Sequence, residues 1–123
     1  MAAPNIVNVT SIVGNSLSVA VGTSATQLAS NAAASNKVFK INSIVVANID
    51  GTNAADITVN IYSAAALGGT PIAIVSTISV PADASLIVTD KTTTFYLLEN
   101  QSIGAIAGTA GDLVATISFE EIT

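Results

Sequence analysis

The chain has 123 residues, of which 50% are hydrophobic and 9% charged, and its formal net charge is −5. It contains no Cys, His, Trp or Arg. These absences exclude thiolate and imidazole metal sites and any catalytic nucleophile paired with a histidine, and three lysines are too few to neutralise a row of phosphates.

The N-terminal third predicts short strands separated by a break. Asn5–Val13 and Leu17–Val21 are candidate strands, and Gly14-Asn15 between them has the composition of a turn. The expected organisation is therefore a segment 1–13, serving as an N-terminal arm or first strand, followed by a single β-sandwich domain over 14–123. The length suffices for one domain with its own core and no disulfides.

Lys37–Ile49 is the longest apolar stretch and is expected to form a central strand, or one covered on both faces. Period-2 alternation places one set on a common face, namely Phe39, Ile41, Val45, Ala47 and Ile49. Ile44 and Val46 make the opposite face apolar as well. The segment Asp50–Asp56 that follows is rich in residues that form Asx turns, which predicts a hairpin to the next strand.

Asp56–Tyr62 and Asp112–Glu120 show the clearest alternation of apolar and polar residues, typical of half-buried antiparallel strands. No segment combines a helical apolar stripe with a cap. The remaining candidate strands are Thr26–Ala29, Ile72–Val80, Leu86–Thr89, Phe95–Leu98 and Ile103–Ala107. The sequence thus predicts an all-β fold, a single antiparallel β-sandwich of jelly-roll-like form.

Two groups of acidic residues are candidates for chemistry. Glu120 and Glu121 are adjacent on one predicted strand, so their side chains should point to opposite faces and cannot act as a carboxylate pair. Asp50, Asn53 and Asp56 could supply oxygens to Ca²⁺, although Asx turns explain the same residues and are favoured. We expect neither enzymatic activity nor a bound metal or other cofactor.

The surface pattern favours a protein that functions as part of a larger assembly. Mean hydropathy is +0.69, and the strands around Leu17, Ile72 and Ile103 contain no basic residue to guard a sheet edge. An unguarded edge in a stable protein is expected to be covered by the chain itself or by a neighbouring subunit. No apolar run approaches the roughly 18 residues of a spanning helix, and the first residues do not read as a signal peptide, so we expect no membrane association and folding in the cytoplasm.

The sequence resembles small virion proteins of tailed bacteriophages, especially phages of cyanobacteria and other aquatic bacteria. The resemblance lies in Ala3–Val7, in Lys37–Ile41 continuing through Asp50–Tyr62, and in Val80–Asp83 continuing through Phe95–Leu97 to Ser118–Ile122. Proteins of this kind are expected to carry a Glu-Gly-Asp turn after the Tyr-Leu strand, where this chain has Glu99-Asn100-Gln101.

The resemblance implies a structural component of the virion, most readily a head decoration or cement protein at the capsid surface, synthesised in the host cytoplasm. Its expected partners are the major capsid protein and other copies of itself, in a homotrimer, without nucleic acid. The residues expected to contact the lattice by β-addition are Ala2, Ala3, Pro4, Asn5, Ile6, Val7 and Val9. The alternatives are a neck, tail or fibre-associated subunit and a carbohydrate-binding module that stacks sugars on Tyr62 and Tyr96.

Overall fold

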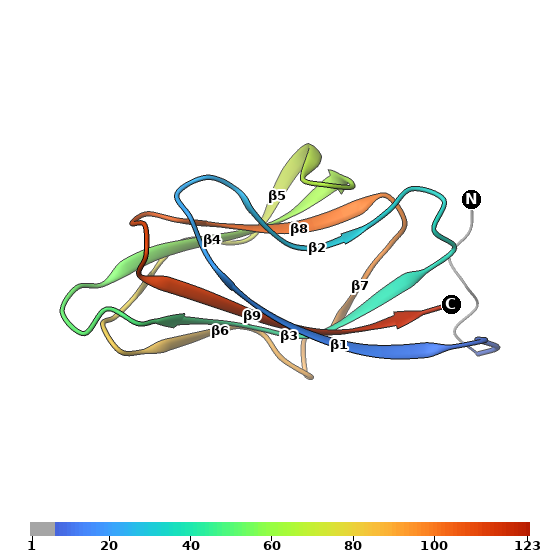
Figure 1. The fold of residues 1–123 in the computed structure, drawn as a ribbon, viewed down its shortest axis with the longest axis horizontal. Coiled ribbons are helices and arrows are strands. Elements are labelled where there is room, and N and C mark those ends of the chain that lie inside the picture. Colours follow the sequence, from blue (N-terminus) through green and yellow to red (C-terminus); the bar gives the residue numbers. More distant parts are fainter. Residues whose placement is uncertain (1–6) are drawn as a thin grey trace.

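The computed structural model describes residues 7–123, which form two antiparallel sheets packed face to face, with no helix in that part of the chain (Figure 1). The strands in chain order are β1 (Ile12–Ala20), β2 (Thr26–Asn31), β3 (Val38–Asn48), β4 (Ala55–Ala64), β5 (Gly68–Val80), β6 (Ser85–Thr89), β7 (Phe95–Leu97), β8 (Gln101–Ala107) and β9 (Leu113–Ile122). The predicted all-β sandwich is confirmed.

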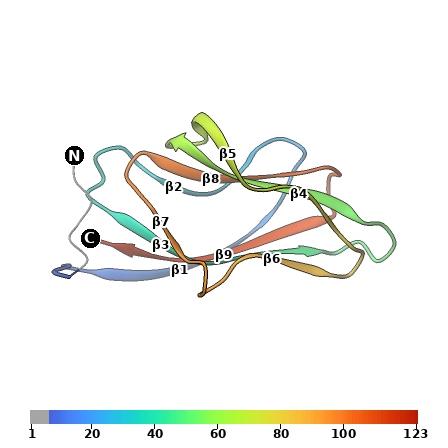
Figure 2. The same ribbon diagram turned by 180° about the vertical axis from the view of Figure 1, so that it is seen from behind.

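The topology is that of a jelly roll. One sheet has the order β1-β9-β3-β6, with β7 also paired to β3, and the other has the order β2-β8-β4-β5. Strands pair from the two ends of the chain inward: β1 with β9, β2 with β8, β3 with β6 and β7, and β4 with β5. Both views of the sandwich show the two layers with β1 and β9 in one and β2 and β8 in the other (Figures 1 and 2). This nesting of antiparallel pairs is how jelly rolls wrap a strand ribbon into two sheets.

The core lies between the sheets and follows the alternation of the strands. Leu113, Ala115 and Ile117 of β9 are buried in one core cluster with Ile57 and Val59 of β4, as their period-2 pattern predicted. Such burial is the main favourable term of folding, because each fully buried aliphatic side chain contributes about 1.5–3 kcal/mol.

The face assignment within β3 is corrected by the structure. A bulge at Asn42 shifts the register between Ile41 and Ser43, so that Ile44 and Val46 continue the buried row begun by Ile41. Val45, Ala47 and Ile49 were expected to share the buried face with Ile41. They lie instead on the outer side, and Ile49 is exposed. The strand is central, as predicted, because β9 lies on one side and β6 and β7 on the other.

The expected hairpin after β3 is also wrong, since β3 and β4 belong to different sheets. The connection crosses from one sheet to the other, and the buried side chain of Asn48 holds it there. The Nδ2 of Asn48 donates to the carbonyls of Asn53 and Val80, both at 2.9 Å, and its Oδ1 accepts from the amide of Asp50 at 2.9 Å. One side chain therefore joins the end of β3, the crossing loop and the end of β5.

A second buried asparagine performs the same role at the other crossing, from β2 to β3. The Nδ2 of Asn31 donates to the carbonyls of Lys37 at 2.9 Å and Leu97 at 3.2 Å, while its Oδ1 accepts from the hydroxyl of Ser35. Since buried polar groups must be paired to be tolerated, these two amides help to fix the crossings on either side of β3.

Two further expectations from local composition are wrong. Gly14-Asn15 does not break the chain, because β1 runs without interruption through both residues. Ile103 is not on an edge strand, because β8 lies between β2 and β4. In residues 7–123 no helix is long and apolar enough to cross a membrane.

Candidate interaction surfaces

The residues expected to contact a lattice lie mostly outside the described part of the chain, namely Ala2, Ala3, Pro4, Asn5 and Ile6. Within it, Val7 is exposed and Val9 is half-buried. The amides of Thr10 and Ser11 both donate to the carbonyl of Thr123, and the amide of Thr123 donates to the carbonyl of Ser11. The chain is thus tied to its own C-terminal residue immediately before β1.

β1 forms one lateral edge of its sheet, because the only strand paired with it in residues 7–123 is β9. The pairing is regular over nine residues, from Ile12 opposite Ile122 to Ala20 opposite Val114. Leu17 lies opposite the buried Ile117 and therefore faces inward, yet 45% of its surface is exposed. The opposite sheet does not cover this part of the inner face.

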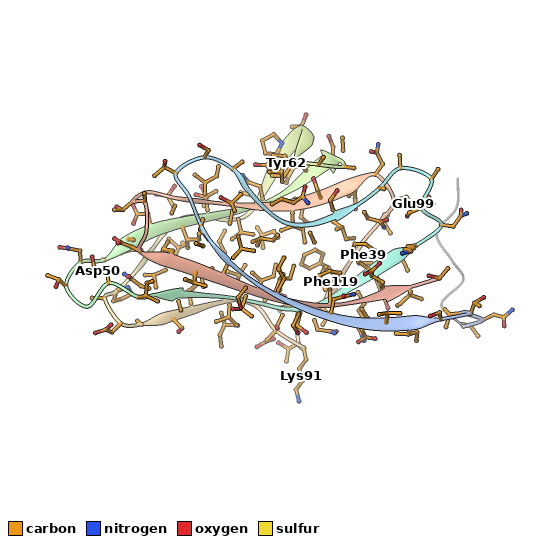
Figure 3. All side chains as sticks on the ribbon, viewed as in Figure 1. Phe39, Asp50, Tyr62, Lys91, Glu99 and Phe119 are labelled. Carbon is orange, nitrogen blue, oxygen red and sulfur yellow. The ribbon has the colours of Figure 1, made fainter. Side chains whose placement is uncertain are left out.

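The charged side chains are gathered at the two ends of the sandwich and in one loop, and none belongs to β1 itself, although Glu121 of β9 accepts from Asn15 of β1. At one end of the sandwich lie Asp50, Asp56, Asp83 and Asp112, and at the other lie Lys37, Lys40, Glu99, Glu120 and Glu121. Asp90 and Lys91 lie in the β6–β7 loop, where Lys91 projects away from the sandwich (Figure 3). No charged residue occurs in β1, β2, β5, β6, β7 or β8.

The acidic turn Asp50–Asn53 is held by Asx-type hydrogen bonds. The Oδ1 of Asp50 accepts from the amide of Thr52 at 2.8 Å and its Oδ2 accepts from the Nδ2 of Asn53 at 3.3 Å. These bonds to the ionised form hold the pKa of Asp50 below its ordinary value of 3.8. The Nδ2 of Asn53 points toward Asp50, so this side-chain hydrogen bond stabilises the turn. In the described part of the chain no three acidic groups gather as a metal site would require.

Of the two tyrosines expected to form a sugar-stacking surface, Tyr62 is buried, with 6% of its surface exposed, and Tyr96 is 43% exposed. Tyr62 lies on the outer face of its sheet (Figure 3), and the β4–β5 turn folds back over that face so that Leu67 lies over Gly104. A Cβ added to Gly104 would lie 2.7 Å from the Cδ2 of Leu67 and 3.0 Å from the Cε1 of Tyr62. A stacking platform made of Tyr62 and Tyr96 is therefore wrong.

Three consecutive amides of this turn are bound by side chains from other segments, which the sequence pattern did not reveal. Ala65, Ala66 and Leu67 donate to Asn100, Ser30 and Ser102 at 3.1, 2.9 and 2.8 Å respectively. The Ser102 hydroxyl also donates to the carbonyl of Ala64 at 2.7 Å. The turn is thereby attached to β2, to β8 and to the β7–β8 turn. Asn100 itself has φ +58°, the left-handed conformation for which the Gly of the expected Glu-Gly-Asp turn is suited.

The two adjacent glutamates of β9 also have structural partners. Glu121 accepts from Asn15 at 2.8 Å and forms an ion pair with Lys37 at 3.1 Å, whereas Glu120 accepts from Asn42 at 3.0 Å. The neighbouring glutamates thus bond to different strands, as expected for side chains on opposite faces.

Glu99 is buried at the β7–β8 turn. Its Oε2 accepts from the amide of Asn36 at 3.0 Å, and its Oε1 has no hydrogen-bond partner in residues 7–123. The bond ties the turn to the loop between β2 and β3, beside the crossing held by Asn31. No ligand-sized cavity is found in the described structure.

Neither the protein-family models nor the curated proteins contain a match to this sequence. Among solved structures, the chain is similar to one from Bacillus endospore appendages, described as a novel family of disulfide-linked pili. The two share 18% identity with a TM-score of 0.49, over 90% of this chain and 86% of the other. The 123 residues contain no cysteine.

Proposed function

We propose that this chain is a structural subunit that acts by binding other proteins over its surface, and specifically a capsid decoration protein of a tailed bacteriophage. The observation that carries the structural role is the distribution of charge. The charged side chains lie at the two ends and in the β6–β7 loop, which leaves β1 and the middle of both sheets uncharged. Such flanks suit close packing among many copies, because like charges would otherwise repel one another.

The assignment to a virion is supported by the sequence resemblance and is compatible with a jelly roll, a fold found in viral capsid domains as well as in lectins and cupins. A protein that binds only the assembled lattice stabilises it by mass action. In this proposal the segment Ala2–Val9 adds a strand to the major capsid protein, with Ile6, Val7 and Val9 as apolar anchors.

The test is binding of the purified protein to emptied mature heads of a tailed phage that encodes it. Saturation at a fixed number of copies per capsid protein and a higher melting temperature of the heads are the expected results. A double variant Ile6→Lys/Val9→Lys should bind less well, whereas Ile49→Lys, a substitution at an exposed position immediately after β3, should bind normally. Absence of binding to heads together with co-purification with detached tails would transfer the proposal to the tail.

A further inference from the structure

The edges of the two sheets differ in how they are closed to further strands. β5 contains Pro71 and a bulge at Thr77, which has φ +52°, and its register with β4 shifts repeatedly. β2 is six residues long and irregular at Leu28. β6 is only five residues long and is followed by Asp90-Lys91. Proline, bulges, short strands and nearby charges are the devices by which natural sheets prevent pairing at an edge.

β1 itself carries none of these devices, and the nearest charges are those of Glu120 and Glu121 on the neighbouring β9. Its nine residues contain no proline and no charged side chain, and they pair with β9 without a register shift. In an antiparallel pair, half of the backbone amides and carbonyls of an edge strand point away from the sheet. β1 is therefore the longest regular and uncharged edge in residues 7–123.

The inner face beside this edge is incompletely covered. Val13 and Leu17 face the same side of β1, and 52% and 45% of their surfaces are exposed. A strand added to β1 would extend the sheet and place its own inward side chains beside these two residues. The edge thus offers backbone hydrogen bonds together with apolar contact, the combination used in β-addition.

We propose that β1 pairs in antiparallel fashion with β1 of a second copy of this chain, so that two copies of the β1-β9-β3-β6 sheet join across a two-fold axis. The pairing that uses the whole strand is centred on Ser16. It places Val13 opposite Val19 of the second copy, so that two apolar side chains meet on the inner face, and it places the large Ile12 opposite the small Ala20.

Charge favours a second copy as the occupant. The chain carries a net charge of −5, so two copies repel one another unless they meet where charge is lacking. The pairing brings two uncharged strands together, and β9 and β3 lie between the contact and the loops that carry Asp50 and Asp83. No like charges face each other in the paired strands.

The first experiment measures association of the full chain by sedimentation velocity. A single strand pair buries less than the roughly 1,200 Å² of a stable interface, so association should be seen over about 5–500 µM. Val13→Lys/Leu17→Lys should raise the dissociation constant by about 100-fold or more, since four ammonium groups would be gathered on one face of the paired strands. The matched control is Ile72→Lys/Ile78→Lys on β5, where the original residues are 64% and 40% exposed, and it should associate like the wild type.

The second experiment places a single cysteine at the proposed axis and does not depend on the lysine variants folding. Because the chain has no cysteine, Ser16→Cys gives one thiol per copy, and the two thiols would lie opposite each other. A short bismaleimide should link this variant into a covalent dimer much faster than it links Ser76→Cys, whose side chain is exposed on β5. Equal rates for the two variants would overturn the pairing.

Three other results would also refute the proposal: a wild-type protein that stays monomeric at about 500 µM, a closed trimer of the kind the sequence resemblance implies, or loss of association in the β5 control. If Ile6→Lys/Val9→Lys abolishes association while Val13→Lys/Leu17→Lys does not, the N-terminal segment is the occupant and the β1 pairing is wrong. These outcomes concern the purified protein alone, so they are distinct from failure to bind phage heads.

Discussion

Asn48→Ala is expected to be among the most destabilising single substitutions outside the apolar core. The change removes two donated hydrogen bonds and one accepted bond at the crossing from β3 to β4. Val80 has 1% of its surface exposed, so its carbonyl would be left buried without a donor. An unpaired buried group of this kind costs about 1–3 kcal/mol. The carbonyl of Asn53 and the amide of Asp50 lie in a loop that water reaches, and each contributes about 0.5–1.5 kcal/mol.

The expected loss is therefore about 2–6 kcal/mol of unfolding free energy, or a fall in melting temperature of roughly 10 °C or more for a domain of this size. Urea denaturation followed by circular dichroism measures the first quantity, and scanning calorimetry the second. Asn53→Ala is the matched control, since it removes the same side chain from an exposed position of the same loop and should change stability by about 0.5 kcal/mol or less. Equal effects of the two substitutions would show that the crossing does not depend on the buried amide.

Three other measurements probe different parts of the fold. Ser102→Ala should cost about 2–3 kcal/mol in urea denaturation, because it leaves an amide and a carbonyl of the β4–β5 turn without their partner, whereas the more exposed Ser30→Ala should cost about 1 kcal/mol or less; equal losses would contradict this account. Thr77→Gly should stabilise the protein by about 0.5 kcal/mol, because relief of a left-handed β-branched residue exceeds the entropy cost of glycine, and any destabilisation would argue against strain at this position. Bonds to Thr92 lower the pKa of Asp90, as those to Thr52 lower that of Asp50, so both carboxyls should titrate below 3.8 by NMR. Their contribution to stability is complete above that pH and is lost as the pH falls through the lowered pKa values. Titration midpoints at or above 3.8 would exclude this contribution.

The period-2 pattern predicted most strands and the buried face of those that are regular. It succeeded for β9, where Leu113, Ala115 and Ile117 alternate without interruption. It failed in β3, because a bulge adds one residue and exchanges the two faces from that point onward. Both faces of β3 are apolar, so nothing in the local pattern marked Asn42 as the position of the change.

Local turn composition carried less information than periodicity. The Asp, Gly and Asn residues between β3 and β4 are of types that favour any turn. They do not distinguish a hairpin from a crossing between sheets. The distinction depends on Asn48, whose partners lie in the loop and on β5. Likewise, Gly14 reads as a break in the sequence, but it lies within a strand whose pairing with β9 continues past it.

The candidate surfaces were only partly predictable, because they depend on which strands end up at an edge. Leu17 was assigned to an unguarded edge and lies on one, whereas Ile103 has the same local composition and lies in the centre of a sheet. Tyr62 has the sequence pattern of an outward-facing residue, and it does face outward, but the β4–β5 turn covers it. Contacts between segments distant in sequence decided both outcomes.

The absence of protective residues in the edge strand β1 is not required for folding. The core is closed by buried rows from both sheets, and both crossings flanking β3 are held by buried amides, so the sandwich does not require β1 to lack protection. A single lysine in β1 at an exposed position such as Ser16 would guard the edge at little cost to stability, as natural sheets commonly do. The absence of such a residue from all nine positions of β1, in a chain whose charged residues lie elsewhere, is most economically explained by a partner strand that occupies this edge.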